Sequence, residues 1–259
     1  MRRNTRCFNL GEVNIGSDHP ISVQSMTKTD TRDIEKTVEQ INELEIAGCD
    51  IIRCAVPNID AAKSLRGIIL KTKLPIVADI HFEYRLALEA IKSGVHGLRI
   101  NPGNIGQKKR IISVVQSAKD SNIPIRIGVN SGSLEKDLLE KYGYPSADAL
   151  VESAERHLSI LDELDFKNVK VSVKSSNVNI MIDAYRKLAK KTDVPFHLGV
   201  TESGTYEIGS VKSSIGIGSL ISEGIGDTIR VSLTDDPVKE VKMGKNILKH
   251  WAILRMELS

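Results

Sequence analysis

Residues 75–104, PIVADIHFEYRLALEAIKSGVHGLRINPGN, contain two short apolar runs on either side of a segment with helical period. The runs PIVADI (75–80) and VHGLRI (95–100) are short and mostly apolar, as strands buried on both faces are. Between them, EYRLALEAIKSG (83–94) ends in Gly94, a residue typical of the position just after a helix. The stretch therefore predicts a strand, a helix and a second strand, which is the repeating unit of a parallel sheet.

The same unit repeats along the whole chain. The eight apolar runs lie at residues 21–25, 50–56, 75–80, 95–100, 124–129, 169–173, 195–200 and 227–233. The helix candidates between and after them lie at residues 33–48, 59–72, 83–94, 104–121, 146–164, 178–192, 207–223 and 236–250. Eight strands with connections this short favour a closed (β/α)8 barrel, the TIM barrel, because an open doubly wound sheet usually has fewer strands.

The barrel accounts for almost the entire sequence, so residues 1–259 are predicted to form a single domain. We expect residues 1–18 to form a lid or a plug at the bottom of the barrel. The longer stretch between the fifth and sixth strands, residues 130–167, is expected to hold an extra turn or short helix. A short tail is expected after about residue 250.

Composition excludes several classes of protein. The chain holds 36 Lys and Arg against 33 Asp and Glu, a net charge of +3, which argues against partners such as nucleic acid or an anionic membrane. No apolar run approaches the ~18 residues of a membrane span, and the basic N-terminus lacks the apolar core of a secretory signal. The three cysteines form no CxxC pair and cannot supply four thiolates. A cytoplasmic domain of enzyme size is the remaining expectation.

Positive charges recur near the ends of the predicted strands, where barrel enzymes build their active sites. These cations are Arg53, Arg99, Arg126, Lys174 and Arg230. A guanidinium in a buried strand costs on the order of several kcal/mol unless a partner compensates it. The acids at the same rim are few, namely Asp79, Glu202 and either Asp30 or Asp235. We therefore predict that two or three cations lack a protein partner and bind a strongly anionic ligand, most simply a diphosphate.

Other signals are weaker. His81 and His197 together with Asp79 have the ligand types of a divalent metal site. The surrounding cations repel a metal, however, so hydrogen bonding is the favoured role and no metal is assigned. SIGIGSL (214–220) contains G-x-G without the third glycine of a dinucleotide site, and close packing of a helix is the favoured interpretation.

Eight strings near the predicted strand ends resemble one known family. They are SVQSMTKTDT (22–31), IIRCAVP (51–57), IVADIHF (76–82), GLRINPGN (97–104), IRIGVNSGS (125–133), VSVKSSN (171–177), HLGVTESG (197–204) and IRVSLTDDP (229–237). Together and in this order they closely resemble the 4-hydroxy-3-methylbut-2-enyl diphosphate synthases of the methylerythritol phosphate route to isoprenoids. The resemblance implies an oxidoreductase that opens the ring of 2-C-methyl-D-erythritol 2,4-cyclodiphosphate with two electrons. Its product is a linear allylic diphosphate.

The resemblance also implies roles for individual residues. The residues implied to hold the diphosphate are Arg53, Arg99, Arg126, Lys174 and Arg230, with hydrogen bonds from Asn130 and Ser232. His81 and Asp79 would line the same pocket. Glu202, after the seventh run, is the candidate catalytic residue for proton transfer or for a contact with a substrate hydroxyl.

The cofactor and partners that the resemblance implies depend on residues of another kind. The family carries a [4Fe–4S] cluster in a smaller C-terminal domain, held by a Cys-Pro-x-Cys-Gly-like stretch, a further cysteine and a carboxylate. Cys7, Cys49 and Cys54 do not match these ligands. We therefore expect this chain to be the substrate-binding barrel and to be inactive without the cluster domain. Reduced ferredoxin or flavodoxin is the implied electron donor. A homodimer is one expectation, since the barrel of one subunit faces the cluster domain of another.

Three alternative functions stay open from the residues alone. VQSMTKTD and IRVSLTDD faintly echo the pterin-binding barrel of dihydropteroate synthase, although four Phe, five Tyr and one Trp make an aromatic stacking slot less favoured. Lys174 could form a Schiff base, as the lysine of a barrel aldolase does. The third alternative is a barrel that binds a phosphorylated metabolite without catalysis.

Overall fold

A computed structural model describes residues 2–105 and 108–257 of the chain. Eight parallel strands form one sheet in the order β8-β7-β6-β5-β4-β3-β10-β9. They are β3 (Ser22–Met26), β4 (Ile51–Ala55), β5 (Ile76–Asp79), β6 (Gly97–Ile100), β7 (Ile125–Asn130), β8 (Val169–Lys174), β9 (His197–Leu198) and β10 (Thr228–Ile229). A bridge between Val171 and Phe196 joins β8 to β9 and closes the barrel. The predicted (β/α)8 fold is confirmed.

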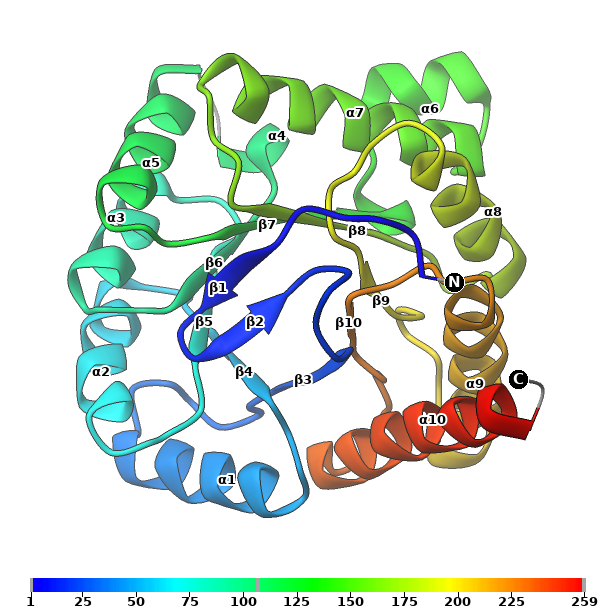
Figure 1. Cartoon of the computed structure of the whole chain (residues 1–259). Coiled ribbons are helices and arrows are strands. Elements are labelled where there is room, and N and C mark those ends of the chain that lie inside the picture. The colour runs from blue at the N-terminus through cyan, green and yellow to red at the C-terminus, as the bar shows by residue number, and fades with distance from the viewer. Residues whose placement is uncertain (1, 106–107, 258–259) are drawn as a thin grey trace.

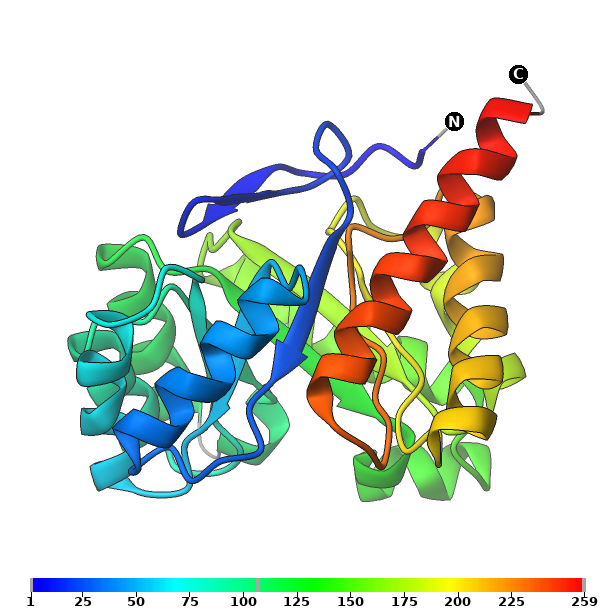
Figure 2. The same cartoon turned by 90° about the horizontal axis from the view of Figure 1, so that it is seen from below.

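Helices surround the barrel on the outside (Figures 1 and 2). They are α1 (Ile34–Ile46), α2 (Ile59–Ile69), α3 (Tyr84–Lys92), α4 (Pro102–Ile105), α5 (Lys108–Asp120), α6 (Lys136–Tyr142), α7 (Ala147–Glu163), α8 (Val178–Ala189), α9 (Tyr206–Ser222) and α10 (Pro237–Glu257), with a 3-10 turn at Ser131–Ser133. The short helix expected within residues 130–167 is α6. The tail expected after about residue 250 is wrong, because α10 continues to Glu257.

Local chemistry fixes where the helices begin and end. Asn58 begins α2 by accepting a hydrogen bond from the backbone N–H of Ala61, and Asn177 begins α8 in the same way. Gly94 ends α3 with a φ of 89°, a conformation that glycine adopts without strain. Gly216 in α9 packs closely on Met181, whose Cε would lie 2.7 Å from a Cβ at this glycine. The sequence 214–220 therefore packs helix α9 against α8, as expected.

The strands present different residues to the two faces of the barrel wall. In β7, Ile125, Ile127 and Val129 are buried in the apolar layer between strands and helices. Arg126 and Asn130 alternate with them and line a cavity inside the barrel, since successive side chains of a strand point to opposite faces. The period of the strand therefore brings charged residues into an interior that branched apolar side chains usually fill.

The N-terminal segment closes one end of the barrel. Strands β1 (Phe8–Leu10) and β2 (Val13–Ile15) form an antiparallel hairpin. Its buried side chains pack on Ile51 and Val77, near the starts of β4 and β5. Figure 2 shows the hairpin lying across this end of the barrel. Of the two expected positions, lid or bottom plug, the structure shows the plug, so the opposite end of the barrel is left for ligands.

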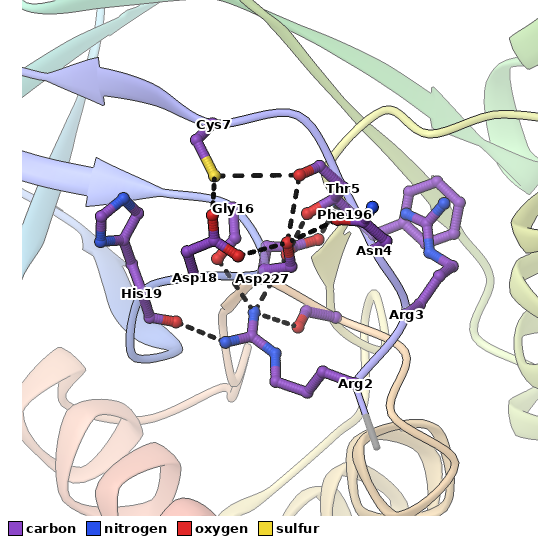
Figure 3. A network of polar contacts seen from close by, with 12 residues as sticks. Arg2, Arg3, Asn4, Thr5, Cys7, Gly16, Asp18, His19, Phe196 and Asp227 are labelled. Atoms are coloured by element: carbon purple, nitrogen blue, oxygen red, sulfur yellow. Dashed lines mark hydrogen bonds and ion pairs between the residues drawn. The ribbon is translucent and has the colours of Figure 1, made fainter.

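A buried carboxylate holds this segment in place (Figure 3). Asp227, just before β10, accepts hydrogen bonds from Arg2 Nη2 at 3.0 Å and from Thr5 Oγ1 at 2.9 Å. Its other oxygen accepts the backbone N–H of Phe196 at 2.8 Å. The guanidinium of Arg3 lies 4.0 Å from the centre of the Phe196 ring. Residues more than 190 positions apart are thus joined at the plugged end.

Within the part of the chain that the structure describes, no helix is both long enough and apolar enough to cross a bilayer.

Candidate functional site

A polar cavity of about 150 Å³ opens at the carboxyl ends of the strands. We call it the cationic cavity. Its lining consists of Arg53, Asp79, His81, Arg99, Arg126, Asn130, Lys174, Thr201, Arg230 and Ser232. The structure therefore brings together all nine residues that the sequence suggested for ligand binding and adds Thr201. Their roles toward a ligand stay predictions.

Strand register explains why these side chains converge. Asp79 in β5 is the lateral neighbour of Arg99 in β6, and Arg99 is the neighbour of Arg126 in β7. Further along β7, Asn130 is the neighbour of Lys174 in β8. Parallel strands end at the same edge of the barrel, so residues at matching positions meet there.

One carboxylate serves three of the basic groups. Asp79 Oδ1 lies 3.2 Å from Arg99 Nη1, and its Oδ2 lies 3.4 Å from Arg53 Nε. His81 Nε2 also lies 3.4 Å from Oδ2. Burial by itself would raise the pKa of Asp79, but the charge of Arg53, the His81 contact and Arg99 outweigh it and hold the pKa below its ordinary value. Asp79 therefore stays ionised and orients two guanidinium groups.

A second acid supports Arg230 from a helix. Glu240 Oε2 in α10 lies 3.6 Å from Arg230 Nη2, while Oε1 accepts the backbone N–H of Leu233 at 2.9 Å. Burial raises the pKa of Glu240 despite the nearby Arg230, and burial together with Arg53 lowers the pKa of Arg230 to about 10. Glu240 was not predicted from the sequence, although its place three residues after Pro237 is typical of a first helical turn.

The other acids expected at the rim have partners elsewhere. Asp30 pairs with Arg32, and Asp235 lies 3.1 Å from Lys239. Both carboxylates therefore serve exposed ion pairs and do not neutralise the cationic cavity.

Two cations of the cavity lack a carboxylate partner. Among the described residues, no carboxylate oxygen lies within 4.0 Å of the Arg126 guanidinium or the Lys174 ammonium. Arg126 Nη1 donates to Ser172 Oγ at 2.6 Å, while its Nε and Nη2 are buried without a hydrogen-bond partner. Burial, reinforced by the neighbouring guanidinium groups, lowers the pKa of Lys174 well below its ordinary value. Among the described residues, two cations of the cavity thus lack an acidic partner, as predicted, and the anionic ligand that they would bind stays a prediction.

Glu202 lies outside the cavity lining. It follows β9 on an exposed loop with a φ of 48°, a left-handed conformation rare for residues other than glycine. Its neighbour Thr201 lines the cavity instead. The catalytic role suggested for Glu202 stays a prediction.

The residues of the metal alternative are not brought together. His197 is fully buried below the cavity, and its Nδ1 lies 2.7 Å from Thr228 Oγ1. Burial and the charge of Lys174 hold the pKa of His197 well below its ordinary value, so the ring is neutral. His81 stays at the rim beside Asp79. Residues 2–105 and 108–257 contain no group of three potential metal ligands.

A further buried cation was not predicted. Lys170 in β8 is the lateral neighbour of Arg126 and is 2% exposed. Burial and the charge of Arg126 lower its pKa to about 7. Its Nζ has no hydrogen-bond partner among the described atoms. The available signal was the alternation in VKVSVK (169–174), which places Lys170 on the same strand face as Lys174.

The three cysteines do not fit an iron–sulfur cluster. Cys49 and Cys54 are buried in the apolar layer, and burial raises the pKa of each thiol to about 12, whereas a cluster needs thiolates. Cys7 precedes β1, near the plugged end of the barrel, and its Sγ lies 3.8 Å from an oxygen of Asp18. No described cysteine lines the cationic cavity.

Comparison with known proteins finds a close sequence match. The chain matches the family model described as GcpE TIM-barrel domain over residues 5–245. A 4-hydroxy-3-methylbut-2-en-1-yl diphosphate synthase (flavodoxin) of Clostridium acetobutylicum is 63% identical over 254 residues, which are 98% of this chain and 73% of the relative. The protein of the same name from Clostridium perfringens is 58% identical, with the same coverage of 98% and 73%.

Comparison of structures finds the same architecture in distant proteins. Yersinia pestis dihydropteroate synthase matches this chain with a TM-score of 0.65 at 10% sequence identity, covering 99% of this chain and 100% of that one. At this identity the match shows a shared barrel fold and says nothing of the substrate.

Proposed function

We propose that the cationic cavity binds the diphosphate of this family's substrate. The chain belongs to the GcpE TIM-barrel family of 4-hydroxy-3-methylbut-2-en-1-yl diphosphate synthases. The family consists of oxidoreductases of isoprenoid biosynthesis. Their reaction is the two-electron reductive ring opening of 2-C-methyl-D-erythritol 2,4-cyclodiphosphate. The dihydropteroate synthase alternative is not favoured, because the likeness to those enzymes lies in the fold alone.

The excess of positive charge in the cavity carries this proposal. Five cations line it, and the acids that contact them are Asp79 and Glu240. Burying unpaired cations is costly, and a bound anion removes that cost. Two linked phosphates supply both the missing negative charge and the oxygen acceptors that guanidinium groups bind well.

The individual contacts follow from the groups left without partners. Arg126 Nε and Nη2 and the ammonium of Lys174 would donate to phosphate oxygens. Arg53 and Arg99, held by Asp79, would present their remaining N–H groups from the other side. Asn130 and Ser232 would add neutral hydrogen bonds at the rim.

Glu202 would act on the carbon part of the substrate rather than on its phosphates. Glu202 follows Thr201 on the loop after β9, and Thr201 lines the cavity. Proton transfer, or a hydrogen bond to a hydroxyl, is the role proposed for it. Replacing it with glutamine should therefore spare diphosphate affinity.

Electrons would come from outside this barrel. The family uses a [4Fe–4S] cluster, and the cysteines described above do not fit one. We therefore assign residues 1–259 the part of substrate-binding barrel and derive no step through the cluster. The names of the curated relatives include flavodoxin, which supports flavodoxin over ferredoxin as the electron donor. A homodimer in which the cluster-bearing part of a second subunit faces the cavity completes this proposal.

Calorimetry with the purified chain tests substrate binding. The chain should bind 2-C-methyl-D-erythritol 2,4-cyclodiphosphate, and inorganic pyrophosphate should compete for the same site. Methylerythritol without phosphates is the matched control and should not bind detectably. Equal binding of the phosphate-free polyol, or no binding of the cyclodiphosphate, would contradict the assignment.

A further inference from the structure

Gly128 occupies an interior position of β7 where glycine is otherwise unfavourable. Arg126 and Asn130, two residues away on either side, line the cationic cavity, so a side chain at residue 128 would point to the same interior. Glycine in the middle of a strand loses more conformational entropy than other residues and gives no side chain to pack. Gly128 is not among the glycines with positive φ, so backbone conformation does not require it. We infer that glycine occupies this position because little space is left there for a side chain.

The guanidinium of Arg99 fills that space. A Cβ atom on Gly128 would lie 2.7 Å from Nε, 3.1 Å from Nη2 and 3.3 Å from Cζ of Arg99. The first distance is shorter than real Cβ contacts, so the guanidinium would have to move. Arg99 is the residue whose Nη1 reaches Asp79 at 3.2 Å and His81 at 3.4 Å. The contact of the Arg99 guanidinium with the backbone of Gly128 therefore determines how Arg99 is oriented toward the Asp79 carboxylate.

We propose that Gly128 is a positioning residue for the cationic cavity, because its missing side chain provides the space in which Arg99 is held against Asp79. The proposal deepens the proposed function, since it rests on the cavity being a diphosphate site. A methyl group at residue 128 would displace the guanidinium from Asp79 or push it into a cavity of only about 150 Å³. Either movement removes a preorganised donor from the phosphates.

Gly128 is a better test than Gly199, which lies beside another cation of the cavity. A Cβ on Gly199 would lie 2.9 Å from Lys174 Nζ but also 2.5 Å from the backbone oxygen of Arg230. The backbone of Arg230 cannot move aside as a flexible side chain can, so a substitution at Gly199 would distort the barrel itself. At Gly128 the three nearest atoms all belong to the side chain of Arg99.

A double-mutant cycle with pyrophosphate as the probe tests the proposal. Gly128→Ala should weaken pyrophosphate binding by about tenfold in the wild-type chain, equivalent to ~1.4 kcal/mol. In an Arg99→Ala background the same substitution should change affinity less than about twofold, because the group that it displaces is gone. Gly132→Ala is the matched control and should change affinity little in either background, since no described residue beyond its chain neighbours has an atom within 4 Å of a Cβ there.

The outcomes separate this proposal from the assignment of the site. An equal loss from Gly128→Ala in both backgrounds, or no loss in the wild-type chain, would overturn the positioning role. If Arg99→Ala and Arg126→Ala both leave affinity unchanged, the diphosphate site itself fails. Should Gly128→Ala lower the melting temperature of the wild-type chain, it should lower it less in the Arg99→Ala background, measured against Arg99→Ala alone. An equal decrease in both backgrounds would also overturn the proposal.

Discussion

At the scale of single residues, the proposed diphosphate binding depends on charges that few protein groups neutralise. Arg99 and Arg230 each have one carboxylate contact, at 3.2 and 3.6 Å, and both line the cationic cavity. Arg99→Ala or Arg230→Ala should each weaken cyclodiphosphate binding by about 1.5–3 kcal/mol, the usual scale for hydrogen bonds to charged groups. Lys242→Ala, an exposed change on α10, is the control for calorimetry. Unchanged affinity in both arginine variants would count against the site.

Lys170 should lower the free energy of unfolding, because its ammonium is buried next to Arg126. This burial and the charge of Arg126 lower the pKa of Lys170 to about 7. Lys170→Met removes the charge with a side chain one atom shorter and should stabilise the fold by about 1–4 kcal/mol, the range seen when buried ion pairs are replaced by apolar residues. Above pH 7 the unfolded lysine binds a proton that the folded one has lost, so the stability of the wild-type chain rises with pH. The gain from Lys170→Met should therefore be largest at pH 6 and shrink toward pH 10.

Urea unfolding at pH 6 and pH 9 measures this difference, with Lys242→Met as the exposed control. A destabilised Lys170→Met variant, or a gain that does not change with pH, would show that Lys170 has a compensating partner.

Residue-level prediction from the sequence succeeded where a charge interrupts an apolar run. Arg53, Arg99 and Arg126 are conspicuous within buried strands, so their convergence follows from strand period and barrel geometry. Glu240 was missed because its ion pair with Arg230 joins helix α10 to the residue that follows β10 and leaves no local pattern. Lys170 was missed because it lies near the start of β8, two interior positions before Lys174.

At the scale of elements, the least predictable part was the N-terminal hairpin. The alternation of strands and helices is local and was predicted correctly for all eight barrel strands. Which end of the barrel residues 1–18 cover depends on contacts with residues far away in the sequence. Asp227 contacts Arg2 and Thr5 across more than 220 positions. No short stretch of sequence contains that information.

Asp227→Asn tests the function of this hairpin as a plug. The amide presents a donor where the carboxylate accepted three hydrogen bonds, so one donor is left buried without a partner. We expect a loss of about 1–3 kcal/mol in the free energy of unfolding. Pyrophosphate affinity should change less than about twofold, because the cavity opens at the other end of the barrel. Wild-type stability, or a loss of affinity matching the loss of stability, would contradict the separation of the two ends.

At the scale of the whole molecule, we propose that binding and electron delivery belong to different parts of the enzyme. The barrel contains the cationic cavity, while its buried thiols and exposed Cys7 fit no cluster. The purified 259-residue chain should therefore bind the cyclodiphosphate without reducing it, even with reduced flavodoxin present. Addition of a cluster-bearing domain in trans should restore product formation. Turnover by the chain alone, with absorbance near 400 nm typical of a cluster, would refute this division.

A crystal structure of the chain with 2-C-methyl-D-erythritol 2,4-cyclodiphosphate would show where the two phosphates bind. We predict that both lie inside the cationic cavity, with oxygens within hydrogen-bond distance of Arg126 and Lys174. Phosphates bound on the outer helices, or an empty cavity in crystals saturated with this ligand, would contradict it.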